Sequence, residues 1–149
     1  MEFTKMHGLG NDFILTAEED GLEWGNVSVR VCDRHTGIGG DGLVLVLPSE
    51  RADFKMRIFN SDGSEPEMCG NAIRCFAKYV YEHGLTIKTD LTVETLAGII
   101  KPTILLEDGA VAGVRVDMGD PRLNRADIPM AGPEGPVVNE PFTIDGETL

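Results

Sequence analysis

Two cysteines in unequal surroundings are the residues of this chain best suited to chemistry. Both lie in the stretch EMCGNAIRCFAKYV, in which Cys69 immediately precedes a predicted helix and Cys75 falls inside it. The first backbone N–H groups of a helix have no acceptor within the helix, and together with the helix dipole they favour an anion. The same position favours the thiolate, which is the reactive form of cysteine. Cys69 is therefore a candidate reactive thiol, and the alternative is an inert cysteine buried near a helix start.

The two residues that follow Cys69 are suited to binding an anion at the same place. Gly70 and Asn71 begin the predicted helix, so they present free N–H groups, and Gly70 has no side chain to keep a ligand from the backbone. Cys75 lies about 240° around the helix from Cys69, so the two thiols cannot face one ligand. We expect Cys75 to be a small packing residue.

Two further patterns suggest a metal or a nucleotide, and neither is convincing. Cys32 and His35 form a C-x-x-H pair that Cys69 and Cys75 could complete, but structural zinc cysteines usually come as pairs two to four residues apart. No metal site is predicted. The stretch GIGGDG, residues 37–42, matches the dinucleotide-binding fingerprint, which requires a helix after it. A strand-like run follows instead, so we interpret this stretch as a tight turn.

Two asparagines stand where a side chain can meet a ligand. Gly8 and Gly10 bracket a bend that delivers Asn11 and Asp12, and Asn60 ends a predicted strand at the mouth of a glycine loop. Each asparagine, taken alone, is more simply explained as a turn residue.

One helix and several strands must position these candidates. Ile73, Phe76, Ala77 and Val80 recur at helical spacing, and Gly84 supplies a stop, which predicts a helix over about residues 70–83. Arg74, with Lys78 and Glu82, falls on the other side of that helix.

The remaining patterns are mostly those of strands. Strands are predicted at residues 13–15, from residue 42 to Pro48, and in the stretch ADFKMRIFN at 52–60, whereas residues 24–35 fit either a helix or an extended piece. Between residues 91 and 119, three extended runs separated by AG and EDG indicate a β-meander. One helix among many strands places the chain in the α+β class.

The composition of the sequence changes after Met118, where proline and glycine become frequent. We predict one domain over residues 1–118, followed over residues 119–149 by a Pro- and Gly-rich linker and the incomplete start of a second domain. The last stretch, FTIDGETL, looks like a strand that enters an Asp-Gly turn and has no partner strand.

The charge balance excludes some classes of partner. The chain has 25 acidic and 13 basic residues, for a formal net charge of −12. This argues against binding to nucleic acid or to an anionic membrane surface. No apolar run approaches the roughly 20 residues of a membrane span. Three cysteines are too few for a disulfide scaffold, and a reducing cytoplasm fits best.

Four segments together carry a resemblance to a known family. They are KMHGLGNDF (residues 5–13), DRHTGIGGDG (33–42), RIFNSDGSEPEMCGNAIRCFAKY (57–79) and VDMGDP (116–121). In order and spacing they resemble diaminopimelate epimerase, and NSDGSEPEMCGNAIRC is the most specific of the blocks.

The resemblance implies a fold and an activity. The fold is a barrel-like, largely antiparallel or mixed β-sheet wrapped around one central helix, as one of two similar domains. The activity is the interconversion of LL- and meso-2,6-diaminopimelate for lysine and peptidoglycan biosynthesis, without a cofactor or a metal. Two cysteines on opposite sides of the substrate's α-carbon exchange the proton. One possible assembly is a homodimer.

The resemblance also assigns residues. Cys69 is one of the two acid/base thiols, Gly70 and Asn71 hold the substrate α-carboxylate through backbone N–H groups, and Asn11 and Asn60 hydrogen-bond its polar groups. The chain departs from the family at Gly42, where many members carry a glutamine that contacts the substrate. It also lacks the second half with the other cysteine, so we expect it to be inactive alone and to need that C-terminal domain.

Two other functions remain open from the sequence. One is a related cofactor-independent amino-acid racemase or isomerase of the same fold, such as a proline racemase-like or phenazine-pathway enzyme. The other is a non-catalytic anion-binding module whose cysteines are inert.

Overall fold

Helix α2, Gly70–Glu82, is the element around which the first part of the chain is built. The computed structural model describes residues 2–17, 21–128, 130–141 and 143–148. The stretch DFILTAEED predicts a strand that leads into a polar turn, and residues 18–20 of that stretch lie outside the described residues. The chain divides into two units, residues 1–117 and 118–149, and α2 belongs to the first. The helix ends as predicted, because Gly84 adopts a positive φ of 70° and Leu85 N–H donates to Val80 O over 2.9 Å.

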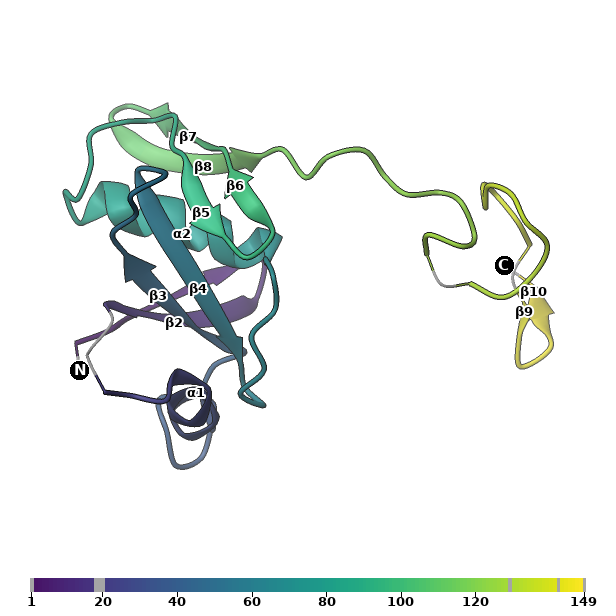
Figure 1. Ribbon diagram of the computed structural model, residues 1–149, viewed down its shortest axis with the longest axis horizontal. Coiled ribbons are helices and arrows are strands. Elements are labelled where there is room, and N and C mark those ends of the chain that lie inside the picture. The colour runs from purple at the N-terminus through teal and green to yellow at the C-terminus, as the bar shows by residue number, and fades with distance from the viewer. Residues whose placement is uncertain (1, 18–20, 129, 142, 149) are drawn as a thin grey trace. The chain divides into compact units, whose positions relative to one another are not determined.

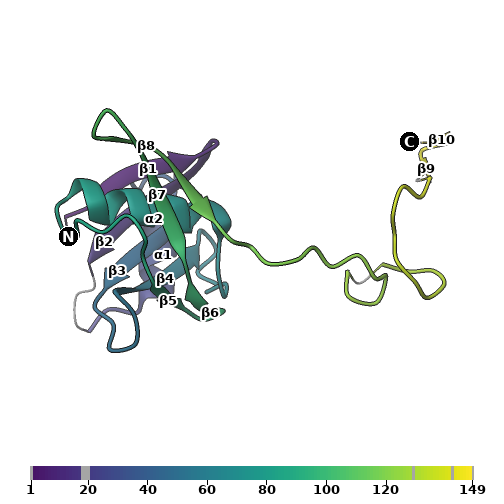
Figure 2. The same cartoon turned by 90° about the horizontal axis from the view of Figure 1, so that it is seen from above.

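A six-stranded mixed sheet curves around this helix (Figure 1). Its strands follow the order β1 (Thr4–Gly8), β2 (Asn11–Ala17), β3 (Gly42–Leu47), β4 (Phe54–Asn60), β5 (Val93–Thr95) and β6 (Gly98–Ile100). The pairs β2–β3 and β4–β5 are parallel, and the other pairs are antiparallel. A separate hairpin, β7 (Pro102–Glu107) with β8 (Ala110–Val116), packs on another side of α2 (Figure 2). The predicted barrel-like sheet around a central helix is confirmed.

The core explains why α2 is placed at the centre. Phe76, Ile73, Ala77 and Val80 have no exposed surface, as the helical spacing predicted. They pack against buried residues of the surrounding strands, namely Phe13, Leu15, Val44, Met56, Ile58, Val93 and Ile104.

A second helix, α1 (Trp24–Cys32), covers the opposite face of the sheet. Residues 24–35, for which the sequence allowed a helix or an extended piece, therefore contain a helix. Trp24 and Cys32 pack on Leu43, Leu45 and Phe59, whereas Val44 faces the α2 side. Strand β3 is therefore buried on both faces, which is why its sequence is an unbroken apolar run.

The predicted β-meander is wrong in its topology. The region forms four strands rather than three, and β5–β6 belongs to the large sheet while β7–β8 forms its own. The change of sheet falls at Pro102, whose nitrogen has no hydrogen to continue a ladder. The expected Asp-Gly hairpin is confirmed, since Asp108 and Gly109 both have positive φ, 51° and 81°.

The second unit contains a short hairpin that the sequence analysis missed. Strand β9 (Thr143–Ile144) pairs with β10 (Glu147–Thr148), so the expectation of no partner strand is wrong. Asp145 and Gly146, with φ of 52° and 87°, form a two-residue turn. This turn places the two residues of β10 beside the two residues of β9, so they pair although each strand is very short. The interpretation of residues 119–149 as a linker and the start of a second domain stays a prediction.

Ion pairs tie the starts of β2 and β3 together. Arg34 donates two hydrogen bonds to the carboxylate of Asp12, over 2.6 and 3.1 Å, and a third to Asp41 over 2.9 Å. The backbones of Asp12 and Asp41 are also joined, because Asp41 N–H donates to Asp12 O over 2.8 Å. The hydrogen bonds from Arg34, supported by Lys5, hold the pKa of Asp12 well below its usual range, against the opposing effect of burial.

If α2 is the centre of the core, truncating its largest buried side chain should be costly. We expect Phe76→Ala to lower the free energy of unfolding by about 3–5 kcal/mol, measured by urea denaturation. The matched control is Ile87→Ala, because Ile87 is 92% exposed, and it should change stability by less than about 0.5 kcal/mol. Equal effects of the two substitutions would contradict the central packing of α2.

The Arg34 ion pairs should give a pH-dependent contribution to stability. The pKa of Asp12 is lower in the folded than in the unfolded chain, so the contribution is present above about pH 4 and is lost as the pH falls through the folded value. We expect Arg34→Gln to cost about 1 kcal/mol at pH 7, because the pairs are partly exposed. The cost should shrink progressively below about pH 4.

Urea denaturation from pH 7 to pH 2 measures this dependence. Arg51→Gln is the control, since Arg51 is exposed and lies 3.8 Å from Glu94. It should cost less than about 0.5 kcal/mol at any pH. A cost of Arg34→Gln that is the same at pH 7 and pH 2 would show that these ion pairs do not act through Asp12.

Candidate active site

The N-terminus of α2 is open toward a ligand. Cys69 is the N-cap residue with an extended backbone, and its side chain makes no capping hydrogen bond. Its carbonyl accepts the N–H of Ile73 over 2.9 Å. Within the part of the chain that the structure describes, no acceptor reaches the N–H groups of Gly70, Asn71 or Ala72, and the first turn contains no acidic residue. The predicted helix start is confirmed, with its free donors beside the thiol.

The three cysteines differ in how well a reagent or ligand can reach them. All three are free thiols; Cys32 and Cys75 are buried, and Cys69 is half-buried at the edge of the core. Burial raises the pKa of both the Cys32 and the Cys75 thiol. Cys32 also contacts the hydroxyl of Ser28 over 3.6 Å. Cys69 is thus the accessible thiol of the three.

The β1–β2 hairpin is pressed against the first turn of α2. Its turn consists of Leu9 and Gly10, both with positive φ, and Gly8 pairs with Asn11 across it. A Cβ atom on Gly8 would lie 3.3 Å from Asn71 O, so only a residue without a side chain fits this approach comfortably. Asn11 is half-buried, and its amide makes no hydrogen bond to any described residue. The contact brings the hairpin that carries Asn11 against the first turn of α2.

Asn60 is the last residue of β4 and lies at the end of the sheet where β2 begins. Its backbone N–H donates to Ser64 O over 2.8 Å, and its side-chain amide donates to Ser64 Oγ over 2.9 Å. Its carbonyl accepts the hydroxyl of Ser28, on α1, over 2.8 Å. Strand register links it to Asn11, because Asn60 pairs with Gly42, and Gly42 pairs with Phe13 of β2. Sequence spacing could not show that α1 supports this residue.

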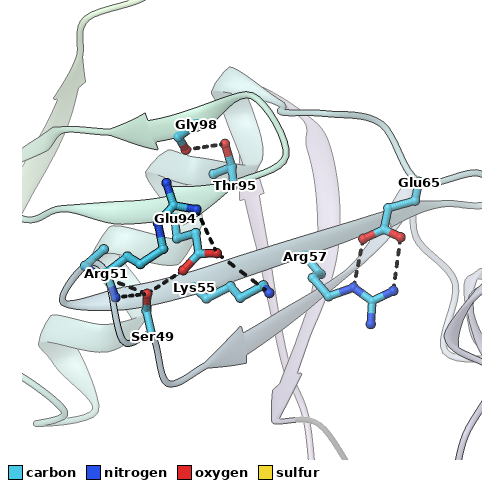
Figure 3. A network of polar contacts seen from close by, with 9 residues as sticks. Ser49, Arg51, Lys55, Arg57, Glu65, Glu94, Thr95 and Gly98 are labelled. Carbon is cyan, nitrogen blue, oxygen red and sulfur yellow. Dashed lines mark hydrogen bonds and ion pairs between the residues drawn. The ribbon is translucent and has the colours of Figure 1, made fainter.

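The loop from Asn60 to Cys69 is anchored at two points. Arg57 of β4 donates two hydrogen bonds to the carboxylate of Glu65, over 2.8 and 3.0 Å (Figure 3). Ala97 N–H, in the turn after β5, donates to Glu67 O over 3.2 Å. These contacts, made at Glu65 and Glu67, fix the path of the chain into Cys69. On the same face of β4 as Arg57, the carboxylate of Glu94 on β5 accepts the hydroxyl of Ser49 and pairs with Lys55 (Figure 3).

The backbone at Gly42 leaves little room for a side chain. A Cβ atom there would lie 2.9 Å from Phe59 O, which is closer than real Cβ atoms approach, and 3.4 Å from the ring of Phe13. A residue with a side chain at this position would require β3 or β4 to shift. The glycine is therefore part of the packing between these strands in this chain.

Arg74 is the residue that sequence analysis placed on the outer side of the helix and that the structure brings to the site. It is half-buried, and its guanidinium donates to Gly70 O over 2.9 Å and to Asn71 Oδ1. The sequence contains a signal for these contacts, because Arg74 follows Asn71 by three residues and Gly70 by four, and residues at this spacing share a helix face. Arg34 was missed as well, since its partner Asp12 is distant in sequence.

The structure thus brings four of the predicted residues together and links the fifth through the sheet. Cys69, Gly70 and Asn71 are consecutive at the helix end, and Asn11 joins them through Gly8. Asn60 lies at the same end of the sheet, two strands away from Asn11. Their roles toward a substrate stay predictions.

Neither of the weaker patterns gains support from the structure. In the described ranges, no three side chains of His, Cys, Asp or Glu could hold a metal ion. GIGGDG follows a turn at residues 34–36, bends at residues 37, 38 and 41, and leads into strand β3, so a strand and not a helix comes after it, as predicted. Among the described helices, none is long and apolar enough to cross a membrane.

Comparison with solved structures supports the fold. A probable proline racemase from Agrobacterium radiobacter, with bound carbonate, superposes with a TM-score of 0.63 at 20% identity over 76% of this chain and 40% of its own. A phenazine biosynthesis protein of the PhzF family from Bacillus anthracis gives a TM-score of 0.57 at 28% identity, over 72% and 36%. The racemase likeness concerns the fold alone.

Comparison of sequences gives a sharper result. The family described as diaminopimelate epimerase matches residues 3–124. Diaminopimelate epimerases from Heliobacterium modesticaldum and Moorella thermoacetica are 61% and 62% identical over 97% and 99% of this chain. The chain spans about half the length of these relatives, 53% and 54%. The chain therefore belongs to the diaminopimelate epimerase family.

Proposed function

We propose that this chain is the N-terminal part of a cofactor-independent epimerase that interconverts LL- and meso-2,6-diaminopimelate. The observation that carries the proposal is Cys69, the accessible thiol, at the open N-terminus of α2 in a member of this family. Family membership supports the substrate, and with it a place in cytoplasmic lysine and peptidoglycan biosynthesis.

The first task of the site is to bind a carboxylate. The N–H groups of Gly70 and Asn71 lie free at the positive end of the helix dipole, which is where a substrate α-carboxylate would be held. Asn11 and Asn60 supply amide groups for other polar atoms of the substrate. This binding fixes the α-carbon beside the Cys69 sulfur.

The second task is to move a proton from a carbon atom that is a weak acid. The Cys69 thiolate takes the α-hydrogen as a proton, so the Cα–H bond breaks, an S–H bond forms and the electron pair stays on carbon. Helix N–H groups lower the energy of the resulting negative charge in a closed, water-free site. A second thiol donates its proton to the opposite face of the carbon, which inverts the configuration. In the reverse direction the two thiols exchange roles.

The second thiol would come from the other half of the family's chain. Cys32 and Cys75 are buried, and Cys75 lies on a different side of α2 from Cys69. Neither is suited to face a substrate held at the helix end. The chain alone is therefore proposed to be inactive and to require the C-terminal domain, with a homodimer as a further possible assembly. No cofactor takes part in the proposed reaction.

The thiols should differ in their rates of alkylation. With iodoacetamide under native conditions, Cys69 should react at least about tenfold faster than Cys32 and Cys75, because those thiols are buried and largely protonated. Peptide mass spectrometry after timed quenching measures each rate. Labelling in denaturant is the control and should make the rates similar. Equal slow labelling of all three under native conditions would favour the inert anion-binding module.

The proton transfer itself can be followed by deuterium incorporation at the α-carbon of diaminopimelate in D₂O. The chain alone should show no incorporation, and the chain combined with the C-terminal half of a full-length relative should restore it. In the combined protein, Cys69→Ser should slow incorporation by at least about 100-fold, the usual contribution of a general base.

Cys75→Ala is the matched control for that experiment, because it removes a thiol that packs in the core. It should keep the rate within about threefold, as expected for a residue outside the reaction. Undiminished incorporation in Cys69→Ser would overturn the assignment of Cys69. A panel with proline and hydroxyproline in place of diaminopimelate separates this activity from that of a related racemase.

A further inference from the structure

Arg74 stands where helix electrostatics disfavour a cation. It is the fifth residue of α2, and its guanidinium turns back over the first turn of the helix, the positive end of the dipole. No acidic residue lies in that turn to offset the charge. The acceptors of Arg74 are the neutral oxygens Gly70 O and Asn71 Oδ1, although the chain has almost twice as many acidic as basic residues. An arginine in this position needs a reason other than helix stability.

The contact with Asn71 supplies that reason. Asparagine side chains readily hydrogen-bond their own or neighbouring backbone N–H groups, which is why asparagine is among the best helix caps. A free Asn71 amide oxygen would thus compete for the open N–H groups at the start of α2. In the structure, this oxygen accepts a hydrogen bond from Arg74 instead, on the flank of the helix.

The contact is held from the other side as well. The hairpin residue Gly8 is so close that a Cβ atom there would lie 3.4 Å from Asn71 Cβ and 3.5 Å from Arg74 Nη2. The hairpin thus lies against the base of the Asn71 side chain and against the guanidinium that holds its amide oxygen.

We propose that Arg74 is a positioning residue, which restrains the Asn71 side chain and so keeps the N–H groups at the start of α2 free for the carboxylate of a ligand. The identity of that ligand rests on the proposed function, but the restraint itself does not. Arg74 acts through Asn71 and does not touch the reacting atoms. Its loss lets the amide occupy the donors that the carboxylate would use.

The test compares two alkylating reagents of similar size at Cys69, anionic iodoacetate and neutral iodoacetamide. The ratio of their rates reports how well a carboxylate is accommodated at the helix end, and a change that merely loosens the structure alters both rates together. In Arg74→Gln, the iodoacetate to iodoacetamide ratio should fall by about fivefold, the factor expected when an ordinary cap hydrogen bond competes for the same donors. An unchanged ratio overturns the proposal.

Charge and restraint are separated by two further variants. Lys78→Gln removes a cation one turn further along the same helix face, where Lys78 pairs with Glu82, and it should leave the ratio unchanged. Asn71→Ala removes the competing amide, so adding Arg74→Gln to it should lower the ratio no further. A fivefold fall that persists in the Asn71→Ala background would show that Arg74 acts by charge alone and would overturn the restraint.

Circular dichroism confirms that each variant is folded before its rates are compared. If Arg74→Gln does not fold, Arg74→Met serves for the same comparison, because it keeps an unbranched stem along the helix. The outcome is independent of epimerase activity. Loss of the proposed function would appear as an active Cys69→Ser enzyme, whereas failure of this inference would appear as an unchanged reagent ratio.

Discussion

The first N–H groups of α2 have no acceptor among the described residues, and the rest of the site depends on this. A helix ordinarily satisfies these groups with an N-cap side chain or an acidic residue in its first turn, and α2 has neither. Leaving the donors open costs stability, and it also leaves a preorganised site for negative charge. The thiol at Cys69 stands beside that site, since it occupies the N-cap position itself.

A helix with an unsatisfied end must be held by other interactions, and its burial provides them. The sheet and the β7–β8 hairpin surround α2, and the apolar area removed from water outweighs a missing cap. The loop that enters the helix is fixed by Arg57 with Glu65, and the strand starts are fixed by Arg34 with its two aspartates. The site is therefore a local exception to helix capping that is supported by a well-packed surrounding structure.

Much of this arrangement could be predicted from the sequence where the signals are local. The α2 stripe, the stop at Gly84 and the Asp108–Gly109 turn each follow from spacing or backbone preference. The β5–β8 topology could not be predicted, because a hairpin signal gives the pairing of two strands and not the sheet to which they belong. The hairpin after Asp145 was missed because two residues show no periodicity.

The site was predicted unevenly for the same reason. Cys69, Gly70 and Asn71 are neighbours in sequence, so the helix start placed them together. The contact of Gly8 with Asn71 joins residues that are 63 positions apart, and the ion pair of Arg34 with Asp12 spans 22, so no local pattern reports them. The family resemblance predicted which residues bind the substrate, but it did not identify the residues that hold those binding residues in place.

The close approach of Gly8 to Asn71 has a mechanical consequence. With no side chain between them, the turn of the hairpin and the first turn of α2 form one packed body, so a shift of either would displace the other. A hinge that opened the site for substrate would then have to lie outside this body.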